Sequence, residues 1–361
     1  MSSFALPAST VSRAQRVADE IARRMAVRLD AVELITGRAA LLGLGPPTRT
    51  SCGGATRLLA AADGWLALTL SRADDLDAVP ALLELPDVDD AWKSLTAAAG
   101  RRSAAEFVER ARLLDIPAAA LGEVAASEPK VKRHNGTSTR KLSDLLVVDL
   151  SSMWAGPLCG RILAAAGATV VKAETAGRPD GTRSGSRKFF DWMNAGKLCY
   201  CGDFTELLRA ADVVIEGSRP AALARHGLSA EQVVARPGRV WIRISGYGSA
   251  QPERVAFGDD AAVAGGLVLC HGDGPAFCGD AIADPLTGLE AAAAVLAALD
   301  SGGGVIVDVS MAAVAATYAA LAASEVTTTE PRLPNVPGRA HELGADNDRV
   351  RELIEPRLLA C

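Results

Sequence analysis

The second half of the chain alternates between apolar strands and helices, and this alternation constrains the fold more than any other feature of the sequence. The run over 145–150 is apolar except for Asp149, as expected for a strand covered on both faces of a sheet. A turn at 155–157 leads into a helix over 158–166, and a second strand is expected over 169–173. Such alternation with short connections predicts a doubly wound, parallel α/β sheet.

The remainder of this half continues the pattern. Further strands are expected over 213–215, 240–244 and 305–309, with helices near 221–226, 259–268 and 285–300 and a closing Ala-rich helix. No G-x-G-x-x-G motif opens the first strand–helix turn, so a nicotinamide or flavin dinucleotide site is disfavoured.

The first half is mainly helical, with one hairpin. Residues 12–29 show the apolar spacing of an amphipathic helix. Two apolar runs within 56–71 flank Asp63-Gly64, a dipeptide that favours a type I′ hairpin turn. Helices are then expected over 74–85, 88–99 and 103–114, followed by an extended segment over 116–124.

A polar, basic segment over 127–141 separates the two halves and is typical of a linker. The chain is therefore expected to divide into an N-terminal helix (1–34), a small α+β domain (35–125), a linker (126–141), a Rossmann-like domain (142–325) and a C-terminal return segment (326–361).

Charge and composition exclude several classes of protein. Lys and Arg number 38 against 43 Asp and Glu, and the net charge of −5 argues against nucleic-acid binding. Seven cysteines without a C-x-x-C pair and four scattered histidines predict neither disulfides nor a metal site. The apolar stretches are too short to span a bilayer, and the N-terminus lacks a signal-peptide pattern. A soluble, cytoplasmic protein with no membrane partner is expected.

Short motifs in the second half follow one another in a recognisable order. They are VDLS (148–151), AGP (155–157), GATVVKAE (167–174), NAGK (194–197), ADVVIEGSRP (211–220), ISGYG (244–248), ADPLTG (283–288) and VDVS (307–310). In this order they resemble the family III CoA-transferases, the CaiB/BaiF-like group that also includes α-methylacyl-CoA racemases. The resemblance implies a Rossmann-like CoA-binding domain in an enzyme that acts on acyl-CoA, as in lipid metabolism.

The first half resembles the same family from its other end. The segments 51–54, 62–67 and 103–107 are similar to the small domain that normally follows the CoA-binding half. The segment 343–348 is similar to the family's usual tail. The resemblance therefore implies that the segments occur here in a rearranged order.

Asp284 is the principal candidate for catalysis. Because it precedes Pro285, its position alone predicts a helix N-cap. The resemblance implies a nucleophile whose carboxylate attacks the acyl-CoA carbonyl to give a mixed anhydride and later an aspartyl-CoA thioester. The two roles are compatible, since helix-terminal amides orient a carboxylate.

Asp259 is a second candidate, on the racemase branch of the resemblance. That branch has a histidine as the partner base at this position, whereas this chain has Phe257-Gly258-Asp259-Asp260. An Asp259/Asp284 pair is able in principle to exchange an α-proton, which keeps racemisation as the weaker alternative. A helix cap is the structural alternative for Asp259 or Asp260.

The resemblance also implies a set of residues that contact CoA. They are Met153, Trp154 and Ala155 at the first strand–helix turn for the adenosine, Lys197 for a phosphate, Arg219 in the Arg-Pro motif, and Arg178 near the second strand's carboxyl end. CoA is expected as a substrate, with no tightly bound cofactor.

The expected activity is CoA transfer between an acyl-CoA and a small carboxylic acid, in a homodimer as the resemblance implies. One alternative is α-methylacyl-CoA epimerisation on the same fold. Another is a non-catalytic CoA-binding subunit, suggested by the rearranged order and by Leu198, where the family often has an arginine. No residue identifies the acyl group or the acceptor acid.

Overall fold

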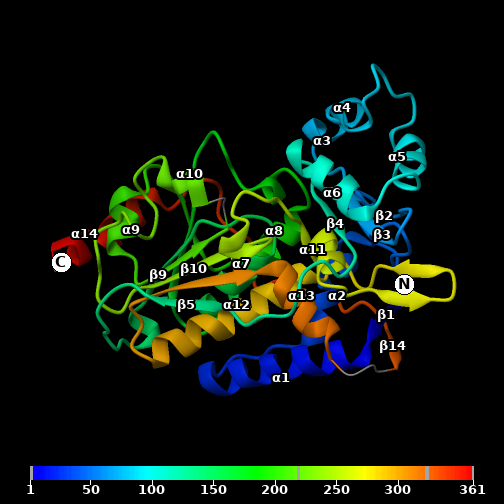
Figure 1. The fold of residues 1–361 in the computed structure, drawn as a ribbon. Coiled ribbons are helices and arrows are strands. Elements are labelled where there is room, and N and C mark those ends of the chain that lie inside the picture. Colours follow the sequence, from blue (N-terminus) through cyan, green and yellow to red (C-terminus); the bar gives the residue numbers. More distant parts are fainter. Residues whose placement is uncertain (1–2, 218–219, 322–324, 360–361) are drawn as a thin grey trace.

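The computed structural model describes residues 3–217, 220–321 and 325–359, and its centre is a seven-stranded sheet (Figure 1). The strand order is β5-β13-β10-β9-β6-β7-β8. Their bounds are β5 Lys130–Arg133, β6 Leu146–Asp149, β7 Thr169–Glu174, β8 Leu198–Cys201, β9 Val213–Glu216, β10 Val240–Ser245 and β13 Val305–Ser310. Neighbouring strands from β13 to β8 run parallel, which confirms the doubly wound α/β fold.

Side chains alternate between two cores along each parallel strand. On β6, Val147 joins one core, whereas Leu146 and Val148 join the other. The first core is covered by α7 (Ala155–Ala165) and α12 (Ala283–Asp300), and the second by α9 (Thr205–Ala210) and α14 (Asn347–Leu359). Burial on both faces explains why these strands read as continuous apolar runs in the sequence.

The N-terminal segment packs on the main sheet domain. Helix α1 (Ala8–Met25) begins four residues before the predicted start at 12 and lies beside α12 in Figure 1. An unpredicted helix, α2 (Ala31–Leu42), begins where the Asp30 side chain accepts a hydrogen bond from the Glu33 amide. Because α2 crosses residues 34 and 35 and packs on α8 and α12, the predicted boundary does not coincide with a break in structure.

A second, smaller group of elements has its own apolar core. Its antiparallel sheet contains β2 (Thr56–Ala60), β3 (Trp65–Thr69) and β4 (Ala118–Ala120), and the predicted hairpin is confirmed by the β2–β3 pairing. The helices of this group are α3 (Ala73–Asp77), α4 (Val79–Leu83), α5 (Ala91–Ala99) and α6 (Ala104–Leu113). The single helix predicted over 74–85 is thus two short helices, with Pro80 in the first turn of the second.

The predicted linker contains a strand of the main sheet, so that part of the linker interpretation is wrong. Strand β5 pairs antiparallel with β13, with Val131 opposite Val307. All four β5 residues are exposed, and an edge strand rich in lysine lacks the apolar alternation that sequence analysis uses.

The remaining elements complete the chain. They are β1 (Phe4–Pro7) paired with β14 (Val326–Thr329), β11 (Leu269–His271) paired with β12 (Gly274–Ala276), α8 (Arg187–Asn194), α10 (Pro220–Ala224), α11 (Gly258–Ala264), α13 (Met311–Ala319) and three short 3₁₀ turns, Leu142–Asp144, Gly181–Arg183 and Gly248–Ala250. Within the described ranges, none of the helices combines the length and apolar character needed to cross a bilayer.

Candidate active site

Asp284 lies in the first turn of α12, where this helix meets α7. The backbone N–H of Ala155, the first residue of α7, donates a hydrogen bond to the Asp284 carboxylate. Close helix packing sets this contact, since a Cβ on Gly288 would lie 2.6 Å from the Ala155 carbonyl oxygen. Because α7 follows β6 directly, Asp284 sits at the carboxyl edge of the sheet, where doubly wound proteins bind ligands.

The capping interpretation of Asp284 is wrong. Helix α12 begins at Ala283, its N-cap is Ile282, and Asp284 is already inside the helix. One of its carboxylate oxygens lies against Gly258, where a Cβ would overlap both that oxygen and the Ala281 carbonyl. The half-buried carboxylate is therefore held between three chain segments and does not cap its own helix.

Asp259 and Asp280 lie beside Asp284. Asp259 is half-buried in the first turn of α11, and its Oδ1 accepts a hydrogen bond from the Ala281 amide at 3.1 Å. Asp280 is fully buried in the segment that leads into α12. Three carboxylates from two helices and a loop thus form one acidic cluster, which we call the Asp284 cluster.

Burial and mutual repulsion make these groups weaker acids than free aspartate. Burial raises the pKa of Asp284 to about 7, and Asp259 and Asp280 contribute to the shift. Burial and the charge of Asp280 raise the pKa of Asp259 to about 7 as well. Two neighbouring carboxyl groups that titrate near neutrality are typical of sites that carry acid–base or nucleophilic chemistry.

Arg38 is a residue of this site that the sequence did not indicate. It belongs to α2, and its Nη1 donates to Asp280 Oδ1 at 2.6 Å. The guanidinium carbon lies 5.6 Å from the Trp154 ring centre and 5.8 Å from that of Phe189. No local motif surrounds Arg38, so only the folded chain reveals that it faces the Asp284 cluster.

The predicted adenosine contacts lie at the turn from β6 to α7, next to the Asp284 cluster. Met153 has a positive φ of 73° and is 43% exposed, so its side chain is accessible from solvent. The Trp154 ring is buried and packs edge-on against Phe189, so it cannot stack on an adenine. Contacts between CoA and the backbone of Trp154 and Ala155 are still predicted.

Lys197 does not serve as a phosphate ligand. Its ammonium is fully buried and is hydrogen-bonded to Asp149 Oδ2 at 2.8 Å, the Pro157 carbonyl at 2.8 Å and Asn194 Oδ1 at 3.0 Å. An ammonium group has three donors, and all three are satisfied inside the protein. The prediction based on the NAGK motif is wrong because Lys197, which precedes β8, is buried against α7.

The two arginines predicted to bind CoA have different outcomes. Arg178 is exposed in the turn that follows β7, on the same edge of the sheet as α7. Its contact with a phosphate stays a prediction. Arg219 lies outside the described residues.

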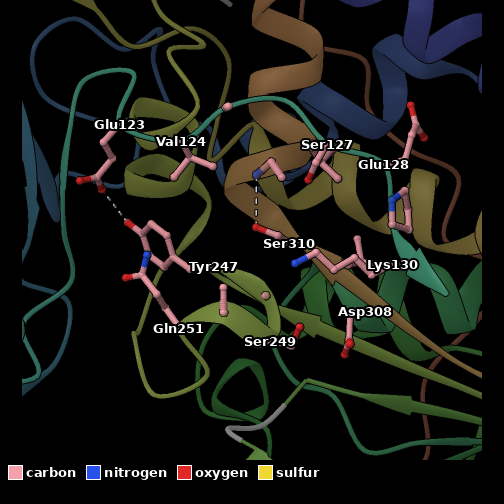
Figure 2. Close-up of a pocket in the computed structure, with 17 residues that line it drawn as sticks. Glu123, Val124, Ser127, Glu128, Lys130, Tyr247, Ser249, Gln251, Asp308 and Ser310 are labelled. Carbon is pink, nitrogen blue, oxygen red and sulfur yellow. Dashed lines mark hydrogen bonds between the residues drawn. The ribbon is translucent and has the colours of Figure 1, made fainter. Parts of the chain in front are cut away.

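A separate cavity of about 290 Å³ opens further along the sheet edge, at the ends of β10 and β13 (Figure 2). Its walls include Tyr247, Asp308 and Lys130, and the Tyr247 hydroxyl is hydrogen-bonded to Glu123 at 3.4 Å. None of the Asp284 cluster lines it. We therefore place the chemistry at the cluster and not in this cavity, which lacks a comparable group of perturbed acids.

Among the residues described by the structure, no group of three or more His, Cys, Asp or Glu side chains is placed to hold an ion. The geometry instead offers one carboxylate with an amide donor, a second acid beside it, and a cation behind both. These groups suit attack on an electrophilic carbonyl or transfer of a proton.

The fold and this site define a doubly wound α/β protein with an acidic cluster at the carboxyl edge of its sheet. The family model for CoA-transferase family III matches residues 142–350, which is more than half of the chain. The chain therefore belongs to CoA-transferase family III.

Curated relatives match a little under half of the chain. A succinyl-CoA–D-citramalate CoA-transferase of Chloroflexus aurantiacus is 32% identical over 196 residues, covering 47% of this chain and 49% of the relative. A succinate–glutarate CoA-transferase of Agrobacterium fabrum is 33% identical over 186 residues, covering 44% and 46%. This chain spans about half the length of the curated relatives it matches.

Solved structures are similar over a comparable share. A CAIB/BAIF family protein from Brucella suis is 28% identical with a TM-score of 0.46, covering 51% of this chain and 56% of that one. A hypothetical protein from Mycobacterium tuberculosis is also 28% identical, with a TM-score of 0.44 and coverage of 53% and 57%.

Proposed function

We propose that this chain transfers CoA between an acyl-CoA thioester and a free carboxylic acid, with Asp284 as the nucleophile. The observation that carries the proposal is the half-buried Asp284 carboxylate at the sheet edge, bonded by the Ala155 amide and flanked by Gly258. Two further facts support it: the chain belongs to CoA-transferase family III, and its curated relatives carry CoA-transferase names.

In the first step, an Asp284 oxygen attacks the thioester carbonyl carbon, the C–S bond breaks, and CoA leaves as a thiolate. The product is an acyl-aspartyl anhydride. The thiolate then attacks the aspartyl carbonyl carbon, which releases the donor acid as a carboxylate and leaves an aspartyl-CoA thioester. An acceptor carboxylate attacks this thioester, which frees the CoA thiolate and forms an anhydride between Asp284 and the acceptor. The thiolate then attacks the acceptor's carbonyl carbon, which releases the new acyl-CoA and restores the Asp284 carboxylate.

The surroundings of Asp284 favour these steps. The Ala155 amide holds one carboxylate oxygen and, after acylation, faces the carbonyl of the intermediate. Burial raises the pKa of Asp284 to about 7, so the attacking anion is more basic than a free aspartate. Because only the ionised form attacks, the rate is expected to rise as pH increases through 7.

The candidate substrates are taken from the names of the relatives. A panel of succinyl-, acetyl- and formyl-CoA donors with citramalate, glutarate and oxalate acceptors follows the names of the relatives. We also propose that the chain works as a homodimer without a tightly bound cofactor. Sedimentation and native mass spectrometry test both statements.

The decisive variant is Asp284→Asn, compared with Asp348→Asn, whose carboxylate is 89% exposed on α14. We expect Asp284→Asn to lose CoA exchange by about a thousandfold or more, since the nucleophile is removed. We expect the control to keep wild-type exchange. Acyl-CoA followed by hydroxylamine should label Asp284 in the wild type. Unchanged exchange in Asp284→Asn contradicts the mechanism, and CoA binding without exchange across the panel favours a non-catalytic subunit.

One observation favours a second candidate, α-methylacyl-CoA epimerisation. Asp259 lies beside Asp284, and burial raises the pKa of each to about 7, so one can be protonated while the other is ionised. Deuterium wash-in at the α-carbon in D₂O without any acceptor acid supports epimerisation. CoA exchange that strictly needs an acceptor supports transfer.

A further inference from the structure

Arg38 is the cation that acts on every member of the Asp284 cluster. Burial raises the pKa of Asp280, Asp259 and Asp284, and the guanidinium, which is bonded to Asp280, opposes each of these rises. It reaches the cluster from α2, a helix that precedes the family-matched region 142–350 in sequence. The N-terminal segment therefore supplies a charge to a site whose carboxylates belong to the second half of the chain.

The charge balance argues against Arg38 as a receptor for an anionic substrate group. Three carboxylates and one guanidinium carry a net charge of −2 when all are ionised. A phosphate or a second carboxylate placed beside Arg38 would meet this negative field at close range. The guanidinium is better matched to the protein's own carboxylates.

The position of the guanidinium is fixed from several sides. Asp280 Oδ1 holds one end at 2.6 Å, and the rings of Trp154 and Phe189 lie on its flank. A Cβ on Gly53 would lie 3.5 Å from Nη2, so the 51–54 loop approaches the other end. The Arg38 side chain is only 24% exposed, which limits screening by water.

We propose that Arg38 is a positioning residue of this site: anchored by Asp280, it keeps Asp284 in the ionised state that the proposed transfer requires. The role of Arg38 in catalysis rests on the proposed function, whereas its effect on the ionisation of Asp284 does not. The charged and titratable groups that face Asp284 are Arg38 from α2, Asp259 from α11 and Asp280 from the segment before α12. From α7 the neighbour is the uncharged Ala155 amide.

The test is a set of variants in the full chain. Arg38→Gln removes the charge, and Arg38→Lys keeps it. If Arg38→Gln folds poorly because it leaves Asp280 unpaired, Arg38→Gln/Asp280→Asn takes its place. This double variant removes both partners, so no unpaired charge is buried. The matched control is Arg13→Gln, because Arg13 is 26% exposed and pairs with Glu290 on the same helix, α12, at 3.3 Å.

The first readout does not depend on CoA chemistry. Carboxyl ¹³C NMR of aspartate-labelled protein, with Asp284→Asn for assignment, gives the titration midpoint of Asp284. An opposite charge at close range lowers a carboxyl pKa by about 1–3 units, so Arg38→Gln should raise this midpoint by about that amount. Arg38→Lys should raise it less, and Arg13→Gln should leave it unchanged. An unchanged midpoint in Arg38→Gln overturns the proposal.

The second readout is the pH dependence of kcat/KM for CoA exchange. In Arg38→Gln its acid limb should move to higher pH by the same amount as the NMR midpoint, and exchange should recover in alkaline buffer. A uniform loss at all pH values indicates a merely structural role and overturns the proposal. If no variant exchanges CoA but the NMR midpoint still shifts, the proposed function fails while the electrostatic role of Arg38 stands.

Discussion

Lys197 allows a sharp test of the structure against the family pattern. Its ammonium is fully buried, bonded to Asp149, Pro157 and Asn194, and lies close to Gly160, where a Cβ would sit 3.1 Å from Nζ. The variant Lys197→Met keeps an unbranched side chain that is one heavy atom shorter, and removes the charge. It leaves the fully buried Asp149 carboxylate without its closest cation.

The expected cost follows from that geometry. Removing one partner of a buried ion pair costs about 3–5 kcal/mol, because the other charge remains desolvated. Asp149 retains hydrogen bonds from the Ser151 amide and hydroxyl, and the charge of Lys172 still favours its ionised form. These interactions keep the loss of stability from exceeding that range. We therefore expect Lys197→Met to lower the free energy of unfolding by about 3–5 kcal/mol, a large part of the stability of a typical domain.

Urea unfolding gives the stability, and calorimetric titration with CoA gives the affinity. The control Lys188→Met, an exposed lysine on α8, should stay within about 0.5 kcal/mol of wild type. The double variant Asp149→Leu/Lys197→Met should recover part of the loss, since no unpaired charge remains. A loss of stability below about 1 kcal/mol combined with a tenfold weaker affinity for CoA would refute the structural role, and would restore Lys197 as a phosphate ligand.

Two further predictions concern Asp284 and its neighbour. The folded state binds the Asp284 proton more tightly than the unfolded state, so this group's contribution to stability falls as pH rises from about 4 to about 7. At pH 8, the free energy of unfolding of Asp284→Asn should therefore exceed that of wild type by up to about 4 kcal/mol, which urea unfolding measures. The difference should vanish at pH 4. Gly258→Ala places a Cβ on the Asp284 carboxylate and should lower kcat/KM at least tenfold, whereas Gly45→Ala, in open space, should not. Equal kcat/KM in Gly258→Ala and Gly45→Ala contradicts the described packing.

Five of the parallel strands of the main sheet were accessible from the sequence because they are buried on both faces, whereas the order of the strands and the parallel strand β8 were not predicted. Continuous apolar runs and short turns are the direct consequence of that burial, and the strands that begin near 146, 169, 213, 240 and 305 all form as expected. The edge strand β5 escaped notice for the opposite reason. Its side chains face water, so its sequence carries no apolar pattern.

The site was predictable only in part. Asp284, Asp259 and Ala155 were indicated by motifs, and the structure brings them together. Arg38 gave no signal, because its partner Asp280 is 242 residues away in the chain. Lys197 gave a misleading signal, since a motif records that a lysine is present and not whether its ammonium faces a ligand or a buried aspartate.

Asp149 and Asp284 lie at the same edge of the sheet, but their pKa values are shifted in opposite directions. Burial alone would raise the pKa of Asp149, but Lys197 and Lys172 lower it below its usual value. Burial also raises the pKa of Asp284, and there the single charge of Arg38 is shared with Asp259 and Asp280, so the pKa stays near 7. The fully compensated carboxylate is a structural anion, and the under-compensated one is a stronger base and nucleophile. In the proposed reaction Lys172 and Lys197 therefore act only indirectly: they pair with the buried carboxylates of Asp180 and Asp149, and the pKa of Asp284 stays raised.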